Sequence, residues 1–360
     1  METILLLGNG FDLMHGLPTK YKDFLFVIQN IDEFQKDFEK RIKNDISDDL
    51  FDKYYENLNV SISVDKVRCM IHILKTNGWA KYYSKCGAEI QGWIDFENEI
   101  LPVIEMVDDV CNYDIDTRAA SYGKFPNVIR FNSNKSARIA MLWDDLFSEG
   151  IGDICLNNGF WEAEYGVLKD KLIDKFKMEL ENLKKAFTIY LQEFVAKKQI
   201  IKKDFIARCH IDKIVSFNYT LLEKEYFKDN DVEICHVHGD IHSENIVLGT
   251  DLIKDDSKKY VYFTKVFQRL AMAKQLLYRN YMDKNDRYLV KILGLSLDMN
   301  DEDIIKPFIE KADPVEIYYC DINDYESKIV NLLKMFGRDV IERRIAERTI
   351  EFREIPNNNE

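Results

Sequence analysis

The chain has 360 residues, 46% of them apolar, so it is long enough to bury the core of one large domain or two ordinary ones. The 50 Lys and Arg residues against 63 Asp and Glu give a formal charge of −13, which argues against a nucleic-acid-binding surface and favours a small-molecule or protein partner. The seven Cys residues include no Cys-x-x-Cys pair, so neither a disulfide framework nor a zinc ribbon is indicated.

Apolar runs that stop at a glycine or a polar residue predict the strands of a parallel sheet covered on both faces. The clearest runs are 3–7, 213–217, 287–293 and 314–319, with weaker candidates at 233–237 and 245–248. The first run is too short to span a bilayer and no cationic leader precedes it, so we expect a cytoplasmic protein without a membrane segment.

Helical spacing accompanies the later strands at 265–280, 302–311 and 325–336, and this alternation predicts an α/β fold with a Rossmann-like parallel sheet flanked by helices. Between the first two strong strands, helical spacing with many charges is found at 33–55, 64–76 and 166–198, with a looser segment at 115–134. We expect the aromatic side chains there to lie in the core, namely Phe24, Phe26, Trp79 and Trp143.

These patterns predict three parts of the chain. Residues 1–30 and 205–340 would form a discontinuous nucleotide-binding α/β domain, and residues 31–204 a mainly helical insertion. Residues 341–360 would form a C-terminal helix and a frayed tail.

The first strand leads into a glycine-rich turn, Gly8-Asn9-Gly10-Phe11-Asp12. Glycines at a strand end let the backbone approach a phosphate closely, and a following helix would offer free N–H groups. The dinucleotide fingerprint would need a third glycine where Leu13 stands, so a tight structural turn is the alternative. The Asp12 carboxylate would repel a pyrophosphate and suits ribose hydroxyls or a helix cap better.

A second polar group, Asn218-Tyr219-Thr220, follows the strand at 213–217. At the carboxyl end of a strand, Asn218 would face the crevice where open α/β sheets bind ligands, and its carboxamide could hold a ribose hydroxyl or a water. The alternative is that Asn218 caps a helix that begins near Leu221.

The third candidate lies between His236 and Asp240, where His238 precedes Gly239. Imidazole titrates near neutral pH, so His238 beside a flexible glycine in a cleft suits a general base. On a strand, His236 would share a face with His238. With Asp240 and His242, these imidazoles could instead form a metal site, although spacing indicates no further ligand.

The fourth candidate is the turn after the strand at 287–293, which contains Gly294 and Ser296. Both residues are placed to contact a phosphate or a ribose at the strand end. The alternative is an ordinary strand-to-helix turn in which Asn300 or Asp301 caps the next helix.

The residues that follow the first strand also carry a resemblance to known families. Gly8, Gly10, Gly16 and Pro18 match without a gap the opening motif of sirtuins, in which Gly-Ala-Gly is followed by Gly-Ile-Pro. The string GNGFDLMHGLPTKYKDF and the element from Trp93 to Glu97 resemble the AbiH family of bacteriophage abortive-infection proteins. The resemblance implies a sirtuin-like, NAD-binding fold and a role in defence against phage.

The resemblance also implies roles for individual residues: Asn218 would be catalytic and His238 would be the base. The other residues implied to contact the nucleotide are Gly8, Asn9, Gly10, Asp12, Gly16, Pro18, Tyr219, Thr220, Gly239, Gly294 and Ser296. Two positions depart from the sirtuin pattern, because Asp12 replaces a Ser and Thr220 replaces an Asp. The chain also lacks the paired Cys of the sirtuin zinc module, which argues against a protein deacylase.

We therefore expect an anti-phage effector that hydrolyses NAD to nicotinamide and ADP-ribose without a metal. One alternative is a non-catalytic sensor of NAD or ADP-ribose, which Thr220 favours, and another is a metal-dependent, nuclease-like effector that uses Asp95, Glu97 and His238. The expected partners are the nucleotide, a phage or host protein trigger and a second copy of the chain, whereas nucleic acid and membranes are not expected. The insertion is the candidate element for control.

Overall fold

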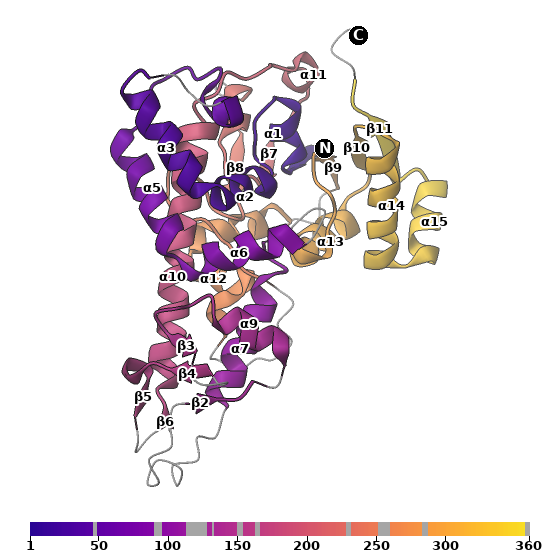
Figure 1. Ribbon diagram of the computed structural model, residues 1–360. Coiled ribbons are helices and arrows are strands. Elements are labelled where there is room, and N and C mark those ends of the chain that lie inside the picture. Colours follow the sequence, from indigo (N-terminus) through magenta and orange to yellow (C-terminus); the bar gives the residue numbers. More distant parts are fainter. Residues whose placement is uncertain are drawn as a thin grey trace.

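The computed structural model describes the chain from residue 1 to residue 356 with several gaps (Figure 1). The described ranges are 1–45, 49–89, 96–112, 128–131, 133–149, 154–162, 166–227, 232–250, 260–282 and 287–356. Within them, no helix is long and apolar enough to cross a membrane.

In the described part of the chain, six parallel strands form one sheet in the order β11-β10-β9-β1-β7-β8. Their bounds are β1 (Glu2–Leu7), β7 (Lys213–Ser216), β8 (Glu233–His236), β9 (Tyr288–Leu293), β10 (Val315–Tyr319) and β11 (Ile350–Glu354). Leu7 is opposite both Ser216 and Leu293, so the three central strands end at the same level. The turns that follow these strands therefore share one edge of the sheet.

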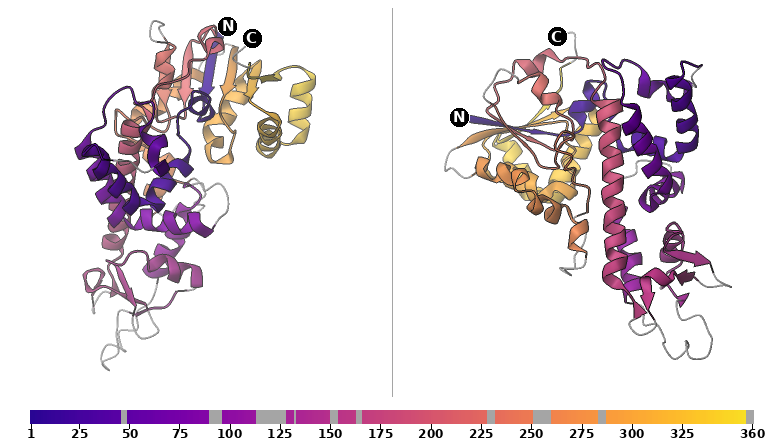
Figure 2. Two further views of the ribbon diagram at one scale, coloured as in Figure 1. Left: turned by 45° about the horizontal axis from the view of Figure 1, so that its top comes forward. Right: turned by 90° about the vertical axis from the view of Figure 1, so that its left-hand side faces the viewer.

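Strand β1 is buried on both faces, as its apolar run predicts. Ile4 and Leu6 pack in a core cluster with Ile304 of α13, whereas Leu5 and Leu7 belong to the core on the opposite face. Figure 2 shows helices on both sides of the sheet in its right-hand view. The expected parallel sheet flanked by helices is confirmed.

The helices that follow the later strands are α12 (Lys265–Ala271), α13 (Glu302–Lys311), α14 (Ile322–Phe336) and α15 (Arg338–Ala346). The expected helix at 265–280 is wrong in its second half, because Met272 leaves helical geometry and residues 273–282 form a 3-10 segment. This segment packs against β8.

Two expectations for the strands also fail. Residues 245–248 form no strand, because Gln268 satisfies the Leu248 backbone: its amide accepts from Leu248 N at 3.1 Å and donates to Leu248 O at 2.9 Å. Conversely, β11 lies within residues 341–360, which were expected to form a helix and a frayed tail. Ile350 to Glu354 alternates apolar and charged residues, so no apolar run predicted this strand. It lies at the edge of the sheet beside β10, where one side can stay polar.

The chain between β1 and β7 contains mostly helices, whose bounds are α1 (Gly10–Met14), α2 (Tyr21–Gln29), α3 (Ile31–Ile42), α4 (Asp52–Tyr55), α5 (Val64–Thr76), α6 (Gly78–Glu89), α7 (Ile100–Cys111), α9 (Asn134–Ala140), α10 (Lys169–Tyr190) and α11 (Asp204–Ala207). Helix α5 has the predicted bounds. Short antiparallel strands also occur there: β2 (Val128–Ile129), β3 (Phe147–Glu149), β4 (Ile154–Leu156), β5 (Trp161–Glu162) and β6 (Gly166–Val167). Most of the looser segment 115–134 lies outside the described residues.

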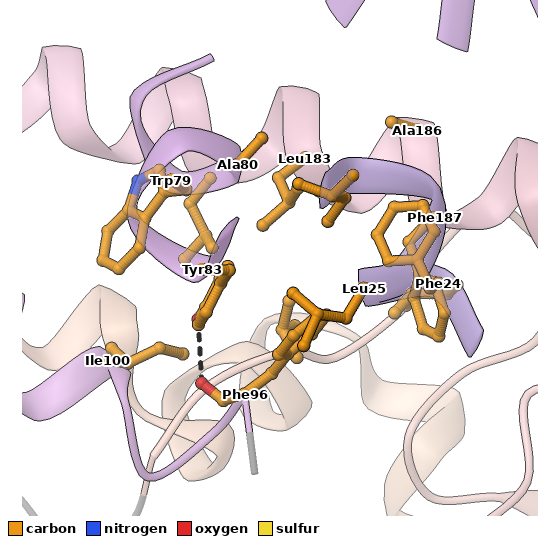
Figure 3. Packing of buried hydrophobic residues seen from close by; sticks show 14 of the residues in the cluster. Phe24, Leu25, Trp79, Ala80, Tyr83, Phe96, Ile100, Leu183, Ala186 and Phe187 are labelled. Atoms are coloured by element: carbon orange, nitrogen blue, oxygen red, sulfur yellow. Dashed lines mark hydrogen bonds between the residues drawn. The ribbon is translucent and has the colours of Figure 1, made fainter. Parts of the chain in front are cut away.

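Helix α10 stands between the sheet and helices α2 to α5 in the right-hand view of Figure 2. Its Phe187 packs with Phe24 of α2. Figure 3 shows these two rings at one end of the cluster and Trp79 at the other, with Tyr83 and Phe96 between them. The Tyr83 hydroxyl donates a hydrogen bond to the Phe96 carbonyl at 2.8 Å. This contact anchors the turn that carries the next residue, Glu97.

The predicted aromatic core is confirmed for Phe24, Trp79 and Trp143, which are buried. Phe26 is only partly buried against the same cluster.

Candidate functional site

The carboxyl ends of the central strands surround a polar cavity. The chain proceeds from β1 to β7 and β8 on one side, then crosses to β9, β10 and β11 on the other, so the strand order reverses between β1 and β9. Open α/β sheets bind ligands at such a point. The cavity there has a volume of about 290 Å³. Its lining residues are Asn9, Gly10, Asp12, Leu13, Thr19, Lys20, Tyr21, Glu97, Leu191, Phe217, Asn218, Tyr219, Thr220, His238, Gly294, Leu295, Ser296, Asp298, Asn300 and Asp301.

This lining brings together nine of the residues expected at a nucleotide site, namely Asn9, Gly10, Asp12, Asn218, Tyr219, Thr220, His238, Gly294 and Ser296. Four others do not line the cavity. Gly8 and Gly239 are not among its lining residues, and Gly16 and Pro18 border a separate surface groove beside Lys198.

Gly8, Gly10 and Gly294 pack two turns against each other, backbone to backbone. Gly8 N donates to Leu293 O at 3.0 Å, and Gly10 N donates to Gly294 O at 2.7 Å. A Cβ added to Gly10 would lie 2.7 Å from Gly294 Cα, and one added to Gly294, whose φ is +69°, would lie 2.2 Å from Phe11 N. These contacts explain the glycines as a tight structural turn, and they use the two N–H groups that a phosphate would otherwise need.

Asp12 is a buried carboxylic acid at the centre of the site, with a relative exposure of 1%. Thr220 Oγ1 donates to its Oδ2 at 2.7 Å, and Asn218 Nδ2 donates to its Oδ1 at 3.2 Å. Burial raises the pKa of Asp12 to about 7, although the hydrogen bond from Thr220 opposes this rise. Asp12 and Thr220, the two positions that depart from the sirtuin pattern, are therefore hydrogen-bonded to each other. Compared with that pattern, the carboxyl group is on the turn after β1 and the hydroxyl group on the turn after β7.

The alternative role of Asn218 as a helix cap is wrong. The short helical turn that follows it, Leu222–Glu225, has Leu221 at its N-cap position, and the Asn218 amide instead points to Asp12. Asn218 Oδ1 is buried and has no hydrogen-bond partner among the described residues. Because leaving a buried acceptor unsatisfied costs about 1–3 kcal/mol, this atom is suited to a ligand or a water.

The His238 side chain contains a second buried acceptor atom without a hydrogen-bond partner among the described residues. Its Nε2 lies 3.0 Å from Asp301 Oδ1, whereas its Nδ1 is buried without a hydrogen-bond partner in the described part of the chain. Burial lowers the pKa of His238, so the ring is neutral at pH 7, with the Nε2 proton directed at Asp301 and a lone pair on Nδ1. This is the form that can act as a base.

Asp301 was expected only as a helix cap or a dipole partner. Asp301 occupies the N-cap position of α13, as expected, but its side chain makes no cap hydrogen bond there. Asp298 caps the 3-10 turn before it, accepting from Asn300 N at 2.9 Å, and the Asp301 carboxylate faces His238. Although burial opposes it, Lys265 and His238 hold the pKa of Asp301 far below its usual value. The only sequence feature that pointed to the contact between Asp301 and His238 was the position of Asp301 in the turn after a strand.

Lys265, the first residue of α12, was not predicted as a site residue, because the only sequence pattern that includes it is the helical spacing at 265–280. Its Nζ lies 2.7 Å from Glu97 Oε2 and 3.0 Å from Asp301 Oδ1. Glu97 itself lines the cavity. Its expected neighbours Trp93, Ile94 and Asp95 lie outside the described residues.

His236 lies behind the site and does not line the cavity. Its Nδ1 lies 3.1 Å from Asn218 O and its Nε2 3.1 Å from Glu223 Oε1. Burial would lower the pKa of His236, but the neighbouring Glu223 carboxylate raises it overall. Strand β8 ends at His236, so the expected shared strand face with His238 is wrong.

The side chains considered for a metal site are engaged separately. Asp240 accepts from the backbone of His242 and Ser243, at 2.8 and 2.9 Å. Within the described ranges, no group of three or more His, Cys, Asp and Glu side chains is arranged to hold a metal ion.

The fold and the site define a parallel α/β protein with a partly acidic cavity where its strand order reverses. The chain matches the family model described as Bacteriophage abortive infection AbiH over residues 4–319, and it therefore belongs to the AbiH family. This membership implies a role in phage abortive infection. A search of curated proteins found no match to the chain.

Proposed function

We propose that this chain is an abortive-infection effector that hydrolyses the nicotinamide–ribose bond of NAD. Family membership supports the defence role. Counted along the chain from β1, the sheet order is 3-2-1-4-5-6, and this order supports a Rossmann-like, sirtuin-like fold whose ligand lies at the switch between β1 and β9.

The observation that carries the proposal is the pair of buried acceptors, Asn218 Oδ1 and His238 Nδ1, at one cavity. NAD and water would give nicotinamide, ADP-ribose and a proton, through a transition state with positive charge on the ribose. Asn218 Oδ1 would hold a ribose hydroxyl or the attacking water. His238 Nδ1 would accept the proton that the water loses, and Asp301 would stabilise the resulting imidazolium.

The charge of the cavity also supports this reaction. Asp12, Glu97, Asp298 and Asp301 contribute carboxyl groups to the lining. Carboxylates held in place before the reaction stabilise a positive charge that develops beside them, and they suit a cationic pyridinium ring. We assign the phosphates to the outer side of the cavity, towards Ser296, because Gly8 and Gly10 use their N–H groups within the fold.

The test is nicotinamide release by purified protein with a chelator present, comparing wild type with Asn218→Ala and His238→Ala. We expect both variants to lose about a thousand-fold in rate, the size of a general-base contribution. His72→Ala, on the exposed side of α5, is the matched histidine control and should match wild type. Wild-type protein that releases no nicotinamide, alone or in phage-infected cells, would refute the reaction.

The non-catalytic sensor is the second candidate, and the commitment of the Thr220 hydroxyl to Asp12 favours it. In that case NAD or ADP-ribose would bind saturably without turnover, and binding would weaken in Asn218→Ala. The nuclease-like alternative receives less support, because the Glu97 carboxylate is paired with Lys265.

We also propose a domain organisation in which residues 1–30 and 205–340 form a nucleotide-binding domain and residues 31–204 form a helical insertion. The insertion would regulate the activity of the site. A phage or host protein trigger, or a second copy of the chain, would bind the insertion.

A further inference from the structure

A buried ion network links His238 to a distant part of the chain. Lys265, at 1% relative exposure, pairs with Asp301 on one side and with Glu97 on the other. Asp301 in turn contacts His238 through the same Oδ1 atom that Lys265 contacts. Glu97 belongs to the turn before α7, nearly 170 residues from Lys265 in the sequence, so the network joins two separate regions.

The network determines which group carries the proton. A partly buried carboxylate favours a compensating positive charge nearby, and Asp301 can obtain it from Lys265 or from a protonated His238. Burial would lower the pKa of Lys265, but Asp301 and Glu97 hold it above its usual value, so Lys265 carries the charge and His238 stays neutral.

The other groups around the imidazole leave this assignment intact. Arg269 of α12 is the second nearby cation, and Asp303 of α13 neutralises it through a contact of 2.6 Å. The rings of Phe217 and Tyr219 pack at 5.6 and 6.4 Å from the imidazole, centroid to centroid. Burial raises the pKa of Tyr219, so this phenol stays uncharged.

We propose that Lys265 and Glu97 are positioning residues that set the proton affinity of His238, and that the turn before α7 thereby regulates the site. Lys265 keeps His238 unprotonated, and Glu97 moderates the field of that lysine. A partner that pulled Glu97 away would leave Lys265 bound to Asp301 alone and would weaken His238 as a base. The base role of His238 rests on the proposed function, whereas the ion network does not.

The experiment is an NMR titration of the histidine side chains in isotopically labelled full-length protein, with His238→Gln to assign the resonance. Lys265→Met should raise the pKa of His238 by about one unit or more, because a neighbouring cation is lost and Asp301 is left uncompensated. Glu97→Gln should lower the pKa of His238 by about half a unit. Without the Glu97 carboxylate, the positive charge of Lys265 is less compensated and disfavours protonation of His238 more strongly.

Glu179→Gln is the matched control, since Glu179 is a buried glutamate of α10 that pairs with Lys175 at 3.0 Å away from the cavity. It should leave the titration of His238 unchanged. If Lys265→Met does not fold, Glu97→Gln decides alone: a His238 pKa that stays constant or rises would overturn the proposal.

Nicotinamide release separates this inference from the proposed function. If His238 is the base, the acidic limb of the pH–rate profile should move with the NMR pKa in each variant. Shifted NMR titrations without any turnover would keep the ion network and refute the glycohydrolase. Turnover with unshifted titrations of His238 would support the glycohydrolase and refute the proposed role of Lys265 and Glu97.

Discussion

Two ion clusters of this protein differ in what they leave unsatisfied. At the edge of the sheet, Lys291 of β9 pairs with Glu316 of β10, and Arg353 of β11 donates to the other oxygen of Glu316 at 2.7 Å. Lys291 and Glu316 are directly opposite in the register, so the strands themselves bring these charges together. The edge cluster is thus a cross-strand contact whose charges compensate one another.

The crevice cluster is built from turns and contains atoms that the fold does not satisfy. Asn218 Oδ1 and His238 Nδ1 are buried without hydrogen-bond partners among the described residues, beside the protonatable Asp12. Paired charges are therefore common to both clusters, and the unsatisfied buried acceptors distinguish the candidate site from the edge cluster.

The largest expected effect concerns the stability cost of Asp12. Its pKa is about 7 in the folded state against a model value of 3.8, so the folded protein binds the proton more tightly and loses stability as pH rises between these values. From pH 5 to pH 8 this loss amounts to about 3 kcal/mol of unfolding free energy. In Asp12→Asn this contribution should vanish, as urea unfolding at the two pH values would measure. An equal pH dependence in both proteins would contradict a raised pKa.

The second prediction concerns Asp301→Asn. An amide can turn its NH₂ group towards His238 Nε2, which moves the ring proton to Nδ1 and removes the acceptor lone pair. Nicotinamide release should fall about a hundred-fold. The pKa of His238 should also fall, since the attraction of the carboxylate is lost. A variant with unchanged turnover would show that Asp301 is only structural.

The smallest effect belongs to the edge cluster. Glu316→Gln removes the charge that Lys291 and Arg353 share, and it should lower the unfolding free energy by about 2 kcal/mol. Nicotinamide release per folded molecule should equal that of wild type. If a folded Glu316→Gln variant lost turnover, the edge cluster would also contribute to activity, and the proposed difference between the two clusters would be wrong.

Local sequence patterns predicted much of the sheet and failed where neighbours decided the outcome. The strong apolar runs are strands within a residue or two of their expected ends. Residues 245–248 have the same apolar character, but Gln268 binds their backbone and no strand forms. Strand β11 forms despite its mixed composition, because β10 offers it an open edge.

The candidate site shows the same division. The sequence predicted that Asn218 and His238 lie near the strand ends, because strand ends are local features. Gly16 and Pro18 match a family motif equally well, yet the chain turns them away to a separate groove.

The sequence by itself therefore determined the family and the parallel α/β class, and it predicted that Asn218 and His238 lie at the cavity. Only the tertiary structure decided that Asp301 orients His238, that Lys265 compensates Asp301, and that Glu97 reaches the same lysine. These partners are 36 to 168 residues apart in the sequence, and no periodicity or local propensity encodes contacts over such separations. They arise only when the turns of the folded sheet converge.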